Sequence, residues 1–274
     1  MEKKLDISVI SPVFNELENL ETFVESVTAV MNSTNMSWEL IIVDDGSNDG
    51  SSKILKKIGH QENIRSILLS KNYGQTTAIQ AGFDNAVGEY FVTLDSDLQN
   101  DPKDIPMLIQ KLINEELDLV VGWRKDRKDN YFFRNLPSIL ANKLIGTITG
   151  VKLHDYGCSL KAYRAEVLKE VKLYGEMHRF IPAWMATKIP ASKISEIEVT
   201  HHPRIAGESK YGISRTFRVF VDLISVYFFM KFFSRPGHFF GLIGLLLSSL
   251  GALILVYLIS LKLLYGFDIG DRPL

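Results

Sequence analysis

The sequence predicts an α/β fold: a mostly parallel sheet covered by helices on both faces, followed by a helical region at a membrane. Short apolar stretches alternate with helical ones through the first half of the chain, and polar clusters follow several of them. One long, uncharged apolar segment lies near the carboxyl end. Strands that alternate with helices are typical of parallel sheets, in which ligands bind at the carboxyl ends of the strands.

The elements of the predicted sheet can be assigned in order along the chain. Each strand is a short apolar run, and each helix is a longer stretch that mixes apolar and polar residues. The predicted strands cover residues 7–11, 40–43, 64–69, 90–94 and 119–121. The predicted helices cover residues 18–31, 51–58, 76–87 and 105–114.

The composition fits a chain with a sizeable core and no general affinity for nucleic acid. Of its 274 residues, 46% are hydrophobic, enough for one large domain or one domain with an appendage. The net charge of -1 does not mark the surface as a nucleic-acid binder. Cys158 is the single cysteine, which excludes an internal disulfide and fits a reducing compartment. The first apolar run has only strand length, so it does not match a signal peptide.

Two polar clusters follow the first and second predicted strands. In "SPVFNE", Pro12 stiffens the loop, Phe14 can stack on a ring, and Glu16 can accept a hydrogen bond or start a helix. In "VDDGS", the residues around Asp45 fit a turn with a helix cap, or an acceptor for a ribose or base. Both interpretations stay open for each cluster.

The stretch "LDSDLQ" places two carboxylates one residue apart after the fourth predicted strand. If the strand continues, Asp95, Asp97 and Gln99 point the same way and converge on one patch. Like charges that close repel each other unless a cation lies between them. Oxygen ligands of this kind suit Mg²⁺ or Mn²⁺ bridging a diphosphate. The sequence has neither GxGxxG after the first strand nor GxxxxGK[ST], which argues against hydride transfer and excludes a P-loop phosphotransferase.

The carboxyl-terminal region has the composition of a membrane anchor. Residues 239–261 are uncharged, mostly apolar and long enough to span a bilayer. Basic residues dominate its amino-terminal flank, which favours a cytoplasmic amino-terminal domain. Residues 213–235 mix charges with aromatics, as in a helix lying among lipid headgroups. The alternative for them is an amphipathic helix packed on the globular domain.

Five motifs follow one another at the predicted strand ends: "SPVFNE", "VDDGS", "NYGQTTAIQAGFDNAVGEYFVTLDSDLQ", "GWR" and "YGCSLKAYR". Together they resemble the family 2 inverting glycosyltransferases with a GT-A fold, a Rossmann-like, mostly parallel sheet. More narrowly, the chain resembles the polyprenyl-phosphate branch, which includes dolichyl-phosphate mannose synthase and undecaprenyl-phosphate glucosyltransferases. The resemblance covers nearly the whole chain, including "HHPRIAGESKYG". It implies that a nucleotide-sugar donates its sugar to a polyprenyl phosphate in the membrane.

The resemblance also implies roles for individual residues. It assigns the metal to Asp95, Asp97 and Gln99, and the nucleotide-sugar to a set that also includes Asp95. It assigns the lipid phosphate to Arg124, Arg134 and Ser138, and catalysis to Asp97, Asp155 and Arg134. The nucleotide-sugar set comprises Pro12, Phe14, Glu16, Asp45, Asp95 and Arg124, with Arg204 and Lys210 on a segment that closes over the diphosphate.

The expected chemistry follows from charge. Mg²⁺ or Mn²⁺ neutralises the leaving diphosphate, with help from Arg204 and Lys210. The acceptor phosphate is already a largely anionic nucleophile at neutral pH, because its second pKa is about 6. Positioning by Arg124, Arg134 and Ser138 then matters more than a strong base. Asp155 is an orienter or base, with structural anchoring as its alternative. Direct displacement inverts the anomeric centre.

The predicted organisation has four parts. Residues 1–212 form a cytoplasmic catalytic domain, 213–235 a juxtamembrane amphipathic helical region, 236–265 a transmembrane helix and 266–274 a tail. Relatives in this branch generally carry two membrane helices, so the resemblance implies that the tail stops short of a second one.

Several alternatives stay open. UDP-glucose is the favoured donor, against GDP-mannose, UDP-N-acetylglucosamine or a modified pentose. A processive polysaccharide synthase is the second enzyme hypothesis, but its QxxRW motif is absent from the sequence. A non-catalytic, membrane-tethered nucleotide-sugar-binding protein is the third. The expected partners are the donor and the polyprenyl phosphate, with no nucleic acid, and a homo-oligomer is left open.

Overall fold

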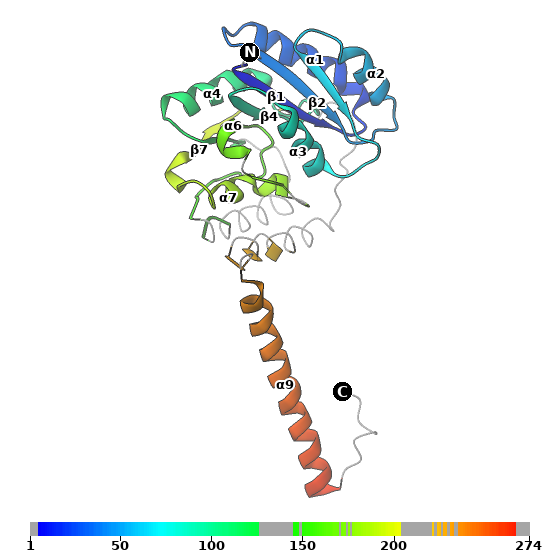
Figure 1. The fold of residues 1–274 in the computed structure, drawn as a ribbon, viewed down its shortest axis with the longest axis vertical. Coiled ribbons are helices and arrows are strands. Elements are labelled where there is room, and N and C mark those ends of the chain that lie inside the picture. Colours follow the sequence, from blue (N-terminus) through cyan, green and yellow to red (C-terminus); the bar gives the residue numbers. More distant parts are fainter. Residues whose placement is uncertain are drawn as a thin grey trace. The chain divides into compact units, whose positions relative to one another are not determined.

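A computed structural model describes most of the first 203 residues and a long carboxyl-terminal helix (Figure 1). The chain divides into two compact units, residues 1–226 and 227–274. The described residues are 5–125, 145–147, 150–169, 171–173, 175, 177–203, 221, 224–225, 227–228, 231–232 and 235–266.

The first unit is built on a 7-stranded sheet with the order β3-β2-β1-β4-β6-β5-β7. Strand β6 runs antiparallel to both of its neighbours, and the other pairs are parallel. The predicted mostly parallel sheet is confirmed. The strands are β1 (Ile7–Val13), β2 (Trp38–Asp44), β3 (Ile64–Leu68), β4 (Tyr90–Thr93), β5 (Leu119–Trp123), β6 (Lys161–Arg164) and β7 (Ile194–Glu198).

Helices follow the strands in the first unit, as the alternating pattern predicts. The four predicted helices are present to within one or two residues at each end, and further short helices and 3₁₀ turns add to them within the described residues. The α-helices are α1 (Leu17–Asn32), α2 (Ser51–Ile58), α3 (Gln75–Asn85), α4 (Ile105–Asn114), α6 (Ala165–Leu168) and α7 (Ile181–Met185). The 3₁₀ turns are η1 (Pro102–Asp104), η3 (Met177–Phe180) and η4 (Ala191–Lys193).

The core explains why these segments take these forms. Every residue of β2 is buried, which is the burial expected of a central parallel strand. Helix α1 buries Leu20, Phe23, Val27 and Met31, which recur every three or four residues and form one stripe. Helix α3 packs against β1 and β2. Its amino-terminal end therefore lies close to the carboxyl ends of these strands.

The second unit contains α9 (Pro236–Tyr265), a helix of 30 residues. Its segment Pro236–Leu264 is long and apolar enough to cross a membrane, and none of its most apolar window is buried within the structure. The helix ends at Gly266, whose φ of 66° suits a residue without a Cβ atom. The predicted helix 236–265 is therefore present. Most of the predicted amphipathic region 213–235 and of the tail lies outside the described residues, so both stay predictions.

Candidate active site

The sheet topology brings five chain segments to one edge of the sheet. Strands β1, β2 and β4 are parallel neighbours, so the loops that follow Val13, Asp44 and Thr93 leave from the same edge. Strand β5 runs in the same direction, because it and β4 are both antiparallel to β6. The reversed strand β6 begins at this edge with Lys161 and delivers the preceding loop there.

The loop after β4 carries the acidic pair, but not in the way the sequence predicts. The expected strand alternation through Gln99 is wrong: β4 ends at Thr93, and residues 94–99 form an irregular loop in which Leu98 has a φ of 60°. The ladder stops because β6, the partner of β4, begins at Lys161 opposite Thr93. The Thr93 hydroxyl also donates to the Ser159 carbonyl, 2.7 Å away.

The two carboxylates nevertheless act on each other. The pKa of Asp95 is raised to about 6, first by burial and then by repulsion from Asp97. Asp95 accepts a hydrogen bond of 2.9 Å from the Gln75 side chain at the start of α3. Asp97 is buried and accepts a hydrogen bond of 3.2 Å from the Gln99 backbone N–H. The pair is thus a partly desolvated negative site that a cation would stabilise.

The donor set fits a hard divalent cation. Among the described residues, no three or more His, Cys, Asp and Glu side chains gather as a metal site. Mg²⁺ is usually held by one or two carboxylates together with substrate phosphates and water, and Asp95 with Asp97 supplies that number. The metal-ligand role of Gln99 stays a prediction.

The loop after β1, called the first loop, lies next to the loop after β4. The latter, residues 94–101, is called the acidic loop. The Ser96 hydroxyl, between the two aspartates, donates to the Pro12 carbonyl at 3.4 Å. Asn15 has a φ of 54°, and its backbone N–H donates to Ser47 at 2.9 Å, which joins the first loop to the second. Glu16 accepts a hydrogen bond of 2.8 Å from the Asn19 side chain at the start of α1. The structure therefore brings the predicted nucleoside residues Pro12, Phe14 and Glu16 to the predicted edge.

Asp45 is an anchor for the loop before α3. Its two carboxylate oxygens accept backbone N–H bonds from Tyr73 (2.7 Å) and Gly74 (2.9 Å). Burial raises the pKa of Asp45 in spite of these hydrogen bonds, which act in the opposite direction. Contact of Asp45 with a nucleoside stays a prediction.

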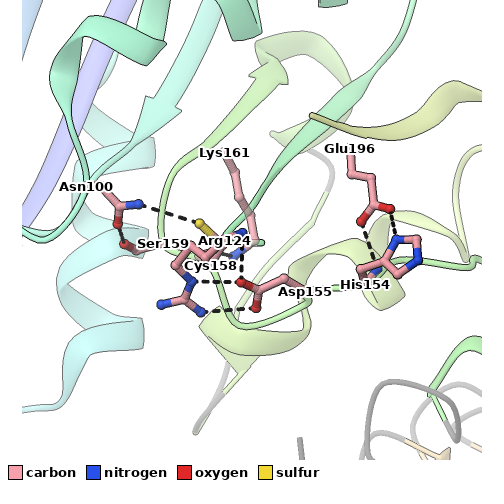
Figure 2. A network of polar contacts seen from close by, with 8 residues as sticks. All are labelled: Asn100, Arg124, His154, Asp155, Cys158, Ser159, Lys161 and Glu196. Atoms are coloured by element: carbon pink, nitrogen blue, oxygen red, sulfur yellow. Dashed lines mark hydrogen bonds and ion pairs between the residues drawn. The ribbon is translucent and has the colours of Figure 1, made fainter. Parts of the chain in front are cut away.

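Arg124 and Asp155 form a bidentate ion pair at the centre of a polar network (Figure 2). Arg124 Nε and Nη2 donate to the two carboxylate oxygens at 2.7 Å and 3.0 Å, and both side chains are largely buried. Burial acts to lower the pKa of Arg124, but the acidic neighbours Asp155 and Asp95 contribute to a net rise. This geometry suits the anchoring alternative for Asp155. Its role as base and the contact of Arg124 with phosphates stay predictions.

The buried residues behind this pair are not evident from the sequence alone. The Lys161 side chain, only 3% exposed, donates a hydrogen bond to the Cys158 carbonyl. Ser159 donates to Asn100 at 2.9 Å, and Asn100 lies on the acidic loop. In the sequence, Lys161 stands out only as a lysine within the otherwise apolar run "LKAY". The antiparallel register of β6 is needed to show that it lies at this edge.

Four of the predicted site residues lie outside the described residues: Arg134, Ser138, Arg204 and Lys210. Their roles stay predictions.

The comparisons with known proteins agree with this arrangement. Residues 8–172 match the family model described as glycosyl transferase family 2. A dodecaprenyl-phosphate galacturonate synthase from Rhizobium johnstonii is 56% identical over 274 residues, which cover 99% of this chain and 81% of the relative. An undecaprenyl-phosphate 4-deoxy-4-formamido-L-arabinose transferase from Pectobacterium atrosepticum is 37% identical, covering 96% of this chain and 78% of the relative.

A solved structure has the same fold. It is the glucosyl-3-phosphoglycerate synthase from Mycobacterium tuberculosis in complex with Mn²⁺, UDP-glucose and phosphoglyceric acid. Its TM-score is 0.64 at 18% sequence identity, over 81% of this chain and 80% of that chain. At this identity the likeness shows the fold, and it confirms the GT-A architecture.

Proposed function

Because this chain belongs to glycosyl transferase family 2, we propose that it transfers a sugar from a nucleotide-sugar to a polyprenyl phosphate at a membrane surface. The observation that carries the proposal is the convergence of Asp95 and Asp97 at the carboxyl edge of the sheet. The lipid acceptor is supported by the names of the two relatives, both polyprenyl-phosphate sugar enzymes. The long apolar helix α9 supports a membrane location, with the first unit on the cytoplasmic side.

The chain's residues have distinct tasks in this reaction. Asp95 and Asp97 would hold Mg²⁺ or Mn²⁺, which supplies positive charge to the leaving diphosphate. The loops after β1 and β2 enclose the nucleoside. Arg134 and Ser138 hold the lipid phosphate, and Arg204 and Lys210 cover the donor diphosphate. Arg124 stays oriented by Asp155.

The proposed transfer needs no general base. An oxygen of the acceptor phosphate forms a bond to the anomeric carbon while the bond from that carbon to the donor diphosphate breaks. The nucleoside diphosphate leaves with the electron pair. Because the acceptor is largely a dianion above a second pKa of about 6, no proton has to be removed from it. Attack opposite the leaving group inverts the anomeric centre.

For the sugar, we propose galacturonic acid in place of the glucose that sequence analysis favoured. The support is the name of the relative that is 56% identical. The second relative's name gives a formamido-pentose, so this sugar belongs in the test as well.

The test is an assay of sugar transfer into lipid. The purified chain in detergent is incubated with polyprenyl phosphate, Mn²⁺ and one labelled donor at a time. The panel holds UDP-galacturonic acid, UDP-glucose, GDP-mannose, UDP-N-acetylglucosamine and a formamido-pentose donor. We expect label in the lipid extract from the galacturonic acid donor, and none with EDTA.

Asp97→Ala is expected to lower this transfer by about 100-fold or more, because it removes half of the proposed cation site. Asp101→Ala is the matched control: Asp101 follows closely on the same loop, but its carboxylate accepts from Lys103 N–H at 3.0 Å. Donor binding without any transfer would contradict the proposal and favour the non-catalytic alternative. Transfer of glucose alone would overturn the proposed sugar.

A further inference from the structure

Lys161 is a buried cation that the proposed chemistry does not use. It is the first residue of β6, paired with Thr93 at the end of β4, and its side chain extends toward the Arg124–Asp155 pair (Figure 2). Its ammonium group donates to the Cys158 carbonyl. None of the ion pairs found among the described residues includes Lys161. A buried ammonium group that lacks a carboxylate partner is costly, so its charge needs an explanation.

The charges around Lys161 supply one. Three aspartates, Asp95, Asp97 and Asp155, share this region with two cations, Arg124 and Lys161. Arg124 is committed to Asp155 by a bidentate contact. This leaves Lys161, which pairs with Thr93 two residues before Asp95, as the second buried cation beside the acidic loop. Burial lowers the pKa of Lys161, while Asp155 and Asp95 act to raise it.

We propose that Lys161 is a positioning residue of the donor site, whose buried positive charge acts on Asp95 and Asp97 and balances the site between a divalent cation and a diphosphate. The inference rests on the proposed function, because it takes Asp95 and Asp97 as the cation site. With Lys161 charged, the acidic pair attracts a divalent cation less strongly and repels a diphosphate less strongly.

The proposal predicts shifts of opposite sign when the charge is removed. In Lys161→Met, Mn²⁺ measured without nucleotide should bind roughly threefold to tenfold more tightly, because a repelling charge is gone. The nucleoside diphosphate UDP measured in EDTA should bind weaker by a similar factor. A merely structural role of Lys161 would weaken both ligands together. Lys161→Arg keeps the charge and should restore both affinities.

The measurements use the full chain in detergent at one fixed pH. The concentration of free Mn²⁺ is measured by electron paramagnetic resonance. UDP binding in EDTA is measured by equilibrium dialysis. Lys103→Met is the matched control, because Lys103 is exposed and its loss changes the net charge equally. If Lys161→Met does not fold, Lys161→Gln takes its place.

The outcomes separate the two proposals. Opposite shifts that Lys161→Arg restores support the role of Lys161. Parallel losses, or affinities equal to those of the unchanged chain, overturn it while the proposed function stands. If the unchanged chain binds neither Mn²⁺ nor UDP, the donor site itself is wrong and the inference is overturned with it.

Discussion

Arg124 and Asp155 form a buried ion pair whose members cannot be removed independently. Their bidentate contact compensates two charges that burial would otherwise penalise. Asp155→Leu leaves the guanidinium group without its ion-pair partner, and we expect a loss of about 3–5 kcal/mol in the free energy of unfolding. Arg124→Met combined with Asp155→Leu should cost less than Asp155→Leu alone, because neither member of the pair is left as an uncompensated buried charge. Denaturant unfolding of the detergent-solubilised chain measures both.

An exposed ion pair nearby gives the control for this prediction. Lys125 and Glu198 lie 2.6 Å apart with each side chain 55% exposed. Glu198→Leu is expected to cost less than about 1 kcal/mol, since water screens such pairs. Equal losses for Asp155→Leu and Glu198→Leu would show that burial does not set the energetics of the first pair.

The residues of the site were predictable to different degrees. The pairing of Asp95 with Asp97 follows from a local motif, although an irregular loop rather than a strand brings the two carboxylates together. The Arg124–Asp155 contact spans 31 residues and depends on the reversed strand β6. No local pattern encodes such a contact, and Lys161 was missed for the same reason.

At the scale of elements, β1 to β5 could be predicted from short, mostly apolar runs, whereas β6 and β7 could not. The buried segments of β1, β2 and β4 show such runs. Strand β6 is short and carries Lys161 and Arg164, while β7 reads "ISEIE" and pairs only with β5, at the end of the sheet. Their formation depends on neighbours from distant parts of the chain, so propensity and periodicity do not reveal them.

Helix α3 depends on a close approach to the sheet at Gly82. A Cβ atom at this position would overlap Cγ2 of Ile10 on β1, and Ile10 is fully buried. In an exposed helix, glycine to alanine stabilises by about 1 kcal/mol. Here Ile10 cannot move aside, so we expect Gly82→Ala to destabilise the protein by about 1–3 kcal/mol. Denaturant unfolding of both chains shows whether Gly82→Ala raises or lowers the free energy of unfolding.

A second substitution tests the mechanism of this effect. Ile10→Leu removes the methyl group on Cβ that the new side chain would meet. The double variant Gly82→Ala with Ile10→Leu should therefore be more stable than the sum of the two single losses predicts. If Gly82→Ala stabilises the chain, helix propensity outweighs packing at this position and the argument fails.

At the scale of the whole molecule, the two units have opposite surface chemistry. Most of the large aliphatic side chains described in the first unit are buried in a core, whereas α9 exposes its own: Leu245, Leu247, Leu253 and Val256 are between 64% and 68% exposed. A helix of 30 residues extends about 45 Å, longer than the roughly 30 Å hydrocarbon core of a bilayer. A bilayer around α9 removes this apolar surface from water.

This assignment predicts a dependence on depth when charge is placed in α9. Leu247 and Leu250 lie near the middle of the helix, and arginine at the centre of a membrane span costs about 2.5–3.5 kcal/mol per residue. Leu247→Arg with Leu250→Arg should release most of the protein from membranes washed with alkaline carbonate. Leu263→Arg with Leu264→Arg adds the same charge at the carboxyl end of the helix, where long side chains reach the interface. That variant should stay in the membrane fraction. If both pairs are released equally, charge rather than depth governs retention, and α9 lies on the bilayer or against protein instead of crossing it.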